Sequence, residues 1–245
     1  MDYFVAALMG IILGILINYF ADVLPNSPGL GAPTCAECQH PFSIRDYLLK
    51  YKCSECGTRL PLRSYLVMIV SIAISVLIKV FPPAVFGYWP SLPIIVLLGV
   101  IFVIDIEHHA VLLKTTVAGF ILFLIYGLVY FGWQSTLLGA LGGLGITLLF
   151  YFLGIAVSKL ISAIRKKKIS EVAFGFGDVM AATILGLLVG WPTIVGVIII
   201  AIVAFALVSV IALIVLILTR KYSAFSNALP FAPFLILGVI VIFYL

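Results

Sequence analysis

The stretch LPIIVLLGVIFVIDIE, residues 92–107, is an apolar run that ends in a carboxylate, Asp105. A carboxylate at membrane depth costs about 2.5–3.5 kcal/mol at a helix centre, so it usually marks a functional site. A second apolar run begins at Asp178, the last residue of Gly175-Phe176-Gly177-Asp178. Two such carboxyls at one depth predict a dyad that shares a proton, the arrangement by which aspartic proteases cut peptide bonds.

The composition places these runs in a membrane. Of the 245 residues, 64% are hydrophobic and only 9% are charged, and the mean hydropathy is +1.34. Soluble domains carry about 25% charged residues, so we expect an all-α polytopic membrane protein. Asp2 stands where a cleaved signal peptide would carry basic residues, so the first segment is predicted to be retained. About eight transmembrane helices are predicted, at residues 3–21, 63–81, 91–106, 115–131, 135–158, 178–190, 192–218 and 229–245.

The basic residues predict the orientation of these helices. Of the 14 Lys and Arg residues, all but Lys79 lie in, or at the edges of, residues 22–62, 107–114, 159–177 and 219–228. Basic residues concentrate in cytoplasmic loops, so these four stretches are predicted to face the cytoplasm. The net charge of +5 is therefore a topology signal and does not indicate a nucleic-acid partner. Both aspartates fall on the cytoplasmic side under this topology.

The four cysteines occur as two pairs, Cys35-Ala-Glu-Cys38 and Cys53-Ser-Glu-Cys56, with 14 residues between the pairs. Two CxxC knuckles at this spacing predict a zinc ribbon, in which four thiolates hold one structural Zn²⁺. A redox role is the alternative, but the surrounding sequence lacks the βαβ pattern that accompanies it. We therefore predict a first transmembrane helix (1–21), a cytoplasmic zinc-binding insertion (22–62) and a transmembrane core (63–245).

Several other residues have ordinary structural interpretations. Glycines spaced four residues apart predict close helix packing, and His108 and His109 are predicted to be interfacial residues. Asp22 is predicted to be a solvated surface acid. The packing glycines are Gly139, Gly143, Gly186 and Gly190.

Taken together, these motifs resemble those of the type IV prepilin peptidases, a family of GxGD-type intramembrane aspartic proteases. The resemblance covers nearly the whole chain, and the motifs follow the family's order. They are Gly10-x3-Gly14-x3-Asn18 with Leu24-Pro25, the two CxxC knuckles, Arg63-Ser64-Tyr65, Val103-Ile104-Asp105-Ile106-Glu107, Gly175-Phe176-Gly177-Asp178-Val179 and Leu229-Pro230-Phe231-Ala232-Pro233.

The resemblance implies that Asp105 and Asp178 are the catalytic pair and that Gly175, Gly177 and Glu107 position the substrate. For Glu107 an interfacial charge is an equally good interpretation. The implied substrate is a prepilin or pseudopilin precursor, whose short basic leader is removed on the cytoplasmic side of a bacterial inner membrane. The remaining partner is membrane lipid.

Many members also methylate the new N-terminus with S-adenosylmethionine, an activity associated with the zinc-bearing insertion. The resemblance connects Gly14 and Asn18 with that methyl transfer. The chain departs from the family pattern at Val23, Met68, Leu112 and Met180, where members commonly carry arginine, an acidic residue, proline and lysine.

Other functions are compatible with parts of the sequence. A GxGD protease of other membrane substrates would share the dyad but not the cysteine pairs. A transporter with two coupling carboxylates would show repeated, broken helices. A non-catalytic membrane scaffold for pilus assembly would need the zinc insertion but neither aspartate.

Overall fold

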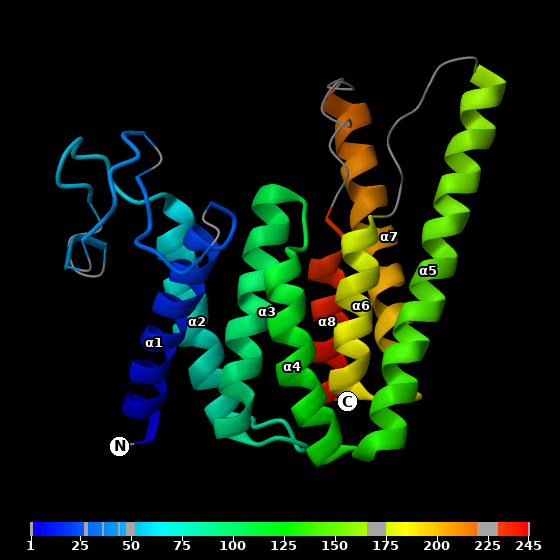
Figure 1. Cartoon of the computed structure of the whole chain (residues 1–245), viewed down its shortest axis with the longest axis horizontal. Coiled ribbons are helices and arrows are strands. Elements are labelled where there is room, and N and C mark those ends of the chain that lie inside the picture. Colours follow the sequence, from blue (N-terminus) through cyan, green and yellow to red (C-terminus); the bar gives the residue numbers. More distant parts are fainter. Residues whose placement is uncertain are drawn as a thin grey trace. The chain divides into compact units, whose positions relative to one another are not determined.

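The computed structural model describes residues 2–26, 29–35, 37–43, 45–47, 52–165, 175–219 and 230–244. Within these ranges it is all-helical apart from two isolated β-bridges, Thr34 with Pro41 and Lys52 with Arg59. Leu229 and residues 166–174 and 220–228 of the predicted cytoplasmic stretches lie outside the described residues. The helices (Figure 1) are α1 (Asp2–Val23), α2 (Leu62–Val80), α3 (Tyr88–His108), α4 (Leu113–Tyr130), α5 (Gly132–Arg165), α6 (Phe176–Val189), α7 (Thr193–Thr219) and α8 (Ala232–Tyr244).

The helices confirm the predicted fold class, an all-α polytopic membrane protein. Among the described residues, six helices are long and apolar enough to cross a bilayer, and α6 and α8 are shorter apolar helices. With 14 residues, α6 is about 21 Å long at 1.5 Å per residue. The hydrocarbon core of a bilayer is about 30 Å thick, so α6 alone is too short to cross it. Irregular backbone is tolerated there only where it is buried in protein or lines a watery cavity.

The chain divides into two compact units, Met1–Ile104 and Asp105–Leu245. In the first unit α1 packs against α2, and the contact is close because α1 presents glycine. A Cβ on Gly10 would lie 2.5 Å from the Cα of Ile72, so only glycine fits. The Ser75 hydroxyl of α2 also donates a hydrogen bond to the Ala6 carbonyl of α1, at 2.7 Å. The cysteine-bearing insertion between α1 and α2 belongs to this unit.

In the second unit, α6 is the central helix and packs against α4, α5, α7 and α8 (Figure 1). Glycines on its neighbours bring their backbones against it. A Cβ on Gly127 of α4 would lie 2.3 Å from the Leu187 carbonyl oxygen, and one on Gly139 of α5 would lie 2.3 Å from that of Gly186. Gly139 also lies against Gly190, where a Cβ would be 2.7 Å from the backbone. A Cβ on Gly143 would likewise lie 2.4 Å from the Ala182 carbonyl oxygen. The predicted packing role of Gly139, Gly143, Gly186 and Gly190 is therefore confirmed.

Candidate active site

Asp105 lies one turn before the end of α3, and the helix ends just beyond it. The N–H of His109 donates to the Asp105 carbonyl at 2.9 Å, and His109 has a positive φ of 51°, which turns the chain out of the helix. The Asp105 side chain is only 4% exposed, and its Oδ2 has no hydrogen-bond partner among the described residues. A helix C-terminus disfavours negative charge, so no local structural need explains a buried carboxyl here.

Asp178 lies in the first turn of α6, where a carboxylate has a structural use. Its Oδ2 accepts a hydrogen bond from the Gly175 N–H at 3.2 Å, and its own N–H donates to the Gly175 carbonyl at 3.1 Å. The positive end of the helix dipole also favours an acidic side chain at this position. These contacts give Asp178 a structural role at the start of α6, and they also fix the direction of its carboxyl.

Asp105 and Asp178, far apart in sequence, line one cavity of about 610 Å³. Its size falls in the range of small-ligand pockets, roughly 300–1,000 Å³. The backbone of Ala232, the first residue of α8, interacts electrostatically with both carboxyls. The first turn of α6 therefore holds the Asp178 carboxyl, and the start of α8 lies near both carboxyls. Free N–H groups and a positive dipole end make such termini favourable places for negative charge.

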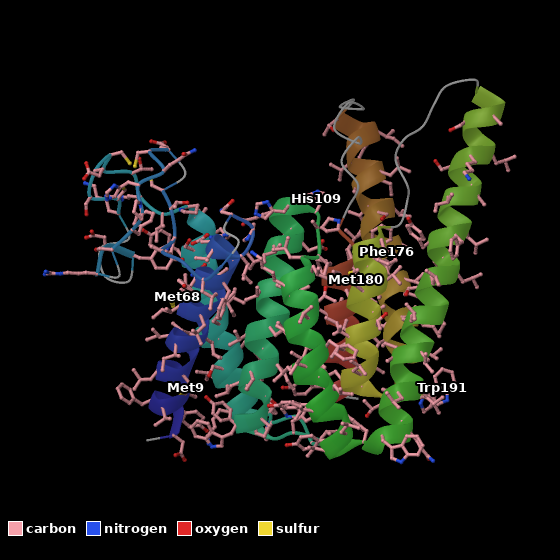
Figure 2. The ribbon with its side chains drawn as sticks, in the orientation of Figure 1. Met9, Met68, His109, Phe176, Met180 and Trp191 are labelled. Atoms are coloured by element: carbon pink, nitrogen blue, oxygen red, sulfur yellow. The ribbon has the colours of Figure 1, made fainter. Side chains whose placement is uncertain are left out.

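The cavity has a polar end and an apolar wall. His109 joins the two aspartates at the polar end, and Figure 2 labels it at the end of α3, with Phe176 at the start of α6. The wall comes from α5, α7 and the segment before α8, which sequence analysis did not connect with the site. Pro230 and Phe231 belong to a motif that the sequence does show, but the residues of α5 and α7 gave no signal, because apolar side chains occur on every face of these helices. The wall residues are Thr147, Phe150, Gly154, Ile198, Ile202, Phe205, Pro230 and Phe231.

The predicted substrate-positioning residues differ in their surroundings. Gly177 lies against the α3–α4 connection, where a Cβ would be 3.2 Å from the Cβ of Val111 and 3.3 Å from its N. A Cβ on Gly175 would make only an ordinary 3.4 Å contact with the Asp178 carboxyl. Both glycines line the cavity. Glu107 is exposed and is not among the residues that line it.

The four cysteine sulfurs lie together, all within 4.8 Å of one another. The Sγ atoms of Cys35 and Cys56 are 3.5 Å apart, and those of Cys38 and Cys53 are 3.6 Å apart. Sulfurs at about 2.3 Å from one tetrahedral Zn²⁺ would be about 3.8 Å apart, whereas a disulfide would bring them to about 2.05 Å. The four cysteines therefore fit a closed metal site, as the sequence predicted.

The two CxxC segments have the same local backbone. In each, the N–H of the first cysteine donates to the carbonyl five residues later, Cys35 to His40 and Cys53 to Thr58. In each, the residue after the second cysteine has a positive φ, 56° at Gln39 and 73° at Gly57. The N–H of that residue donates a hydrogen bond to the carbonyl of the first cysteine. This turn directs both thiols of a segment to one side, which is the geometry of a metal-binding knuckle.

The thiols of the cluster differ in acidity. Side-chain and backbone hydrogen bonds with Thr58 lower the pKa of Cys56 to about 6. The backbone of His40 lowers the pKa of Cys38, but desolvation and the neighbouring sulfurs outweigh this and raise it to about 12. Four thiolates in such a space repel one another, and a divalent cation removes that repulsion.

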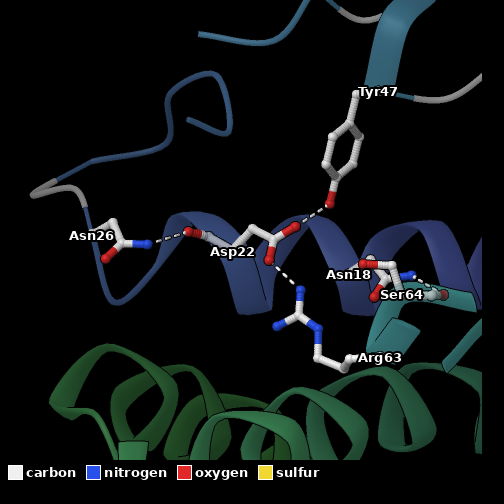
Figure 3. Close-up of polar contacts among 6 residues, drawn as sticks. All are labelled: Asn18, Asp22, Asn26, Tyr47, Arg63 and Ser64. Carbon is white, nitrogen blue, oxygen red and sulfur yellow. Dashed lines mark hydrogen bonds and ion pairs between the residues drawn. The ribbon is translucent and has the colours of Figure 1, made fainter. Parts of the chain in front are cut away.

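Polar contacts join the insertion to the ends of α1 and α2 (Figure 3). The Asp22 carboxylate forms an ion pair with Arg63 and accepts a hydrogen bond from the Tyr47 hydroxyl. The prediction that Asp22 is a solvated surface acid is therefore wrong, because partners distant in sequence cover it. Asn18 donates to the Ser64 carbonyl at 3.0 Å. A Cβ on Gly14 would lie 2.8 Å from Met68 Sδ, so Gly14 serves the packing of α1 on α2.

A model of the type IV leader peptidase family matches residues 92–217 of this chain, from α3 to α7 and including both aspartates. The chain belongs to this family. The family identifies a multi-pass membrane hydrolase that acts as a prepilin leader peptidase. No curated protein and no solved structure matches the chain. The cysteine cluster lies outside the matched residues of this leader peptidase.

Proposed function

We propose that this leader peptidase is an aspartic endopeptidase in which Asp105 and Asp178 carry out the cleavage. One observation supports this most: two carboxyls from different helices line one cavity of a family member, and one of them is almost fully buried. The substrate is a prepilin or pseudopilin precursor, and cleavage takes place on the cytoplasmic side of a bacterial inner membrane. The concentration of Lys and Arg in the connections on one side supports that orientation.

The proposed reaction is a direct attack of water on the scissile amide. One carboxylate takes a proton from the water, while the protonated partner hydrogen-bonds to the scissile carbonyl. The C–O bond forms, and the C–N bond then breaks as the amine receives a proton from the dyad. The Ala232 backbone and the N-termini of α6 and α8 stabilise the negative charge that remains on the pair.

The two ends of the cavity suit different parts of the precursor. The two aspartate carboxyls at one end cleave the scissile peptide bond of the precursor. The apolar wall, with Phe150, Phe205 and Phe231, accepts the first side chains of the pilin's hydrophobic helix. Such a wall also excludes water from the apolar side of the reacting bond, which strengthens the electrostatic interactions of the dyad.

The cysteine cluster is proposed to hold structural Zn²⁺ through Cys35, Cys38, Cys53 and Cys56. The bound ion would order the insertion, which contains little apolar core of its own. We expect one zinc ion per purified chain by elemental analysis, and its loss when Cys35 and Cys53 are both replaced by serine. A zinc content that is the same in this variant would refute the assignment.

Methyl transfer from S-adenosylmethionine to the new N-terminus is the second activity we propose. Two buried polar atoms of α1 and α2 favour it. Asn18 Oδ1 and Ser64 Oγ have no hydrogen-bond partners among the described residues. A polar ligand would complete these bonds, whereas Gly14 is used by helix packing. Mass spectrometry of a pilin processed in the presence of S-adenosylmethionine is expected to show a methylated N-terminus. An unmethylated product would refute this activity.

Leader removal from a co-expressed prepilin tests the main proposal. Wild-type protein is expected to shorten the precursor, and Asp178→Asn is expected to leave it uncut. Asparagine can still accept the Gly175 N–H, so α6 keeps its first turn and the loss reports on chemistry. Cleavage by Asp178→Asn at the wild-type level would refute the dyad.

A further inference from the structure

The connection between α3 and α4 is a short non-helical segment that borders the candidate active-site cavity. After His109 the chain has no helical structure until Leu113, and Leu112 has extended backbone angles, φ −74° and ψ 142°. Ala110 and Val111 both line the cavity. Residues 110–112, here called the template segment, therefore place backbone next to the aspartates.

The backbone of the template segment is largely unused by the fold. Among the described residues, the N–H and C=O groups of Ala110 and Val111 take part in no backbone hydrogen bond. Leu112 differs, because its carbonyl accepts the Thr116 N–H at 3.0 Å and the Thr115 hydroxyl at 2.8 Å. Extended backbone with unpaired N–H and C=O groups is the feature by which one strand recruits another.

The template segment is held between the two catalytic candidates. It follows Asp105 by one turn, and the positive φ of His109 redirects the chain from the helix axis. On the other side, Val111 is packed against Gly177, the neighbour of Asp178, so closely that a Cβ there would meet it at 3.2 Å. Glycine at 177 therefore lets the non-helical α3–α4 connection pass close to the second aspartate.

Peptide cleavage requires an extended substrate, because a helix hides its amides in its own hydrogen bonds. We propose that residues 110–112 form a main-chain template that pairs, strand to strand, with the precursor around the scissile bond. This strand addition holds the precursor extended across the dyad, and it recognises the precursor through main-chain hydrogen bonds rather than through side chains. The inference rests on the proposed peptidase function and specifies how the same site takes its substrate.

Strand pairing has a signature that other modes of binding lack. In a strand, successive side chains point to opposite faces, and successive N–H groups point to opposite edges. Substrate residues at alternate positions should therefore approach one template residue. A substrate bound as a helix or as an irregular loop would show a period of three to four residues, or none.

Disulfide crosslinking tests this pattern in the full-length protein. Ala110→Cys is combined with Asp178→Asn so that the precursor stays intact, and precursors carry a single cysteine at successive positions around the cleavage point. We expect crosslinks at alternate substrate positions, above the level given by Asp178→Asn with only its native cysteines. Equal crosslinking at consecutive positions, a period of three to four, or no crosslinking would overturn the template.

A second measurement uses the unaltered enzyme and distinguishes failure of the template from failure of the peptidase proposal. Synthetic precursors have one backbone amide at a time, other than the scissile one, replaced by an ester, which removes a single N–H donor. We expect kcat/KM to fall roughly 3- to 10-fold per lost hydrogen bond, at alternate positions only. A flat profile would overturn the template and leave the peptidase proposal intact. Failure of the wild type to cut the all-amide precursor would overturn the peptidase proposal itself.

Discussion

Replacing Gly139 of α5 by alanine should force apart α5 and α6, which both contribute residues to the cavity lined by Asp105 and Asp178. The added Cβ would lie 2.3 Å from the Gly186 carbonyl oxygen and 2.7 Å from the Gly190 backbone. Neither neighbour is a flexible side chain, so α5 and α6 must separate by about 1 Å to restore ordinary contact. Overpacking of this kind costs about 1–3 kcal/mol.

Gly145 is a matched control on the same helix, because a Cβ there would meet nothing within 4 Å. Alanine in a helix is favoured over glycine by about 0.5–1 kcal/mol, and both variants receive this gain. The two variants should therefore differ by the overpacking term alone, about 2 kcal/mol in its mid-range. For a chain of this size, that corresponds to roughly 4–8 °C between their thermal midpoints.

The assay is thermal unfolding of both purified variants in detergent, followed by leader cleavage at a temperature where both are folded. Gly145→Ala should unfold at or slightly above the wild-type midpoint and cut normally. Gly139→Ala should unfold lower and cut more slowly, since α5 supplies Thr147 and Phe150 to the cavity wall. Equal midpoints for the two variants would refute the close approach of α5 and α6.

Other substitutions test separate parts of the structure. Gly177→Ala should push the α3–α4 connection by a few tenths of an ångström and lower leader cleavage roughly 3- to 10-fold with little change in thermal midpoint; an unchanged rate would contradict the tight contact. Gln39→Gly should relieve about 1 kcal/mol of left-handed backbone strain and raise the chelator concentration needed to remove zinc, whereas Gly57→Ala should lower it. Arg63→Ala should destabilise the chain by about 1–3 kcal/mol by leaving Asp22, about one-fifth exposed, without its cation. Adding Asp22→Asn should restore part of that loss, and fully additive effects would contradict the ion pair.

The helices could be predicted from the sequence because a bilayer imposes a length on every apolar run. The predicted segment 178–190 and the observed α6, Phe176–Val189, agree within two residues, since Gly175 and Gly190 mark its ends. The equal depth of Asp105 and Asp178 also followed, because charge bias fixes which ends of the segments share a side. That the two carboxyls meet in one cavity is a finding of the structure.

Other features depend on contacts between segments distant in the chain. Asp22 looked solvated because Arg63, its partner, lies 41 positions away. Phe205 lies in a helix that is apolar throughout, so no periodicity distinguished the residues that line a cavity from those that face lipid. Gln39 has a left-handed backbone conformation that usually favours glycine, so its residue type does not indicate a turn. Only comparison with Gly57, the equivalent residue of the second CxxC segment, shows that the two segments share one backbone turn.

The most direct test of the central claim is the cleavage rate of purified protein on a purified precursor, measured for Asp105→Asn, Asp178→Asn and the double variant. Asp2→Asn, which removes an exposed acid at the start of α1, is the control. Residues that act as one catalytic unit are strongly non-additive, so each single variant should fall to background, the double variant should be no slower, and Asp2→Asn should cut like the wild type. Substantial cleavage by either single variant would contradict a dyad formed by Asp105 and Asp178.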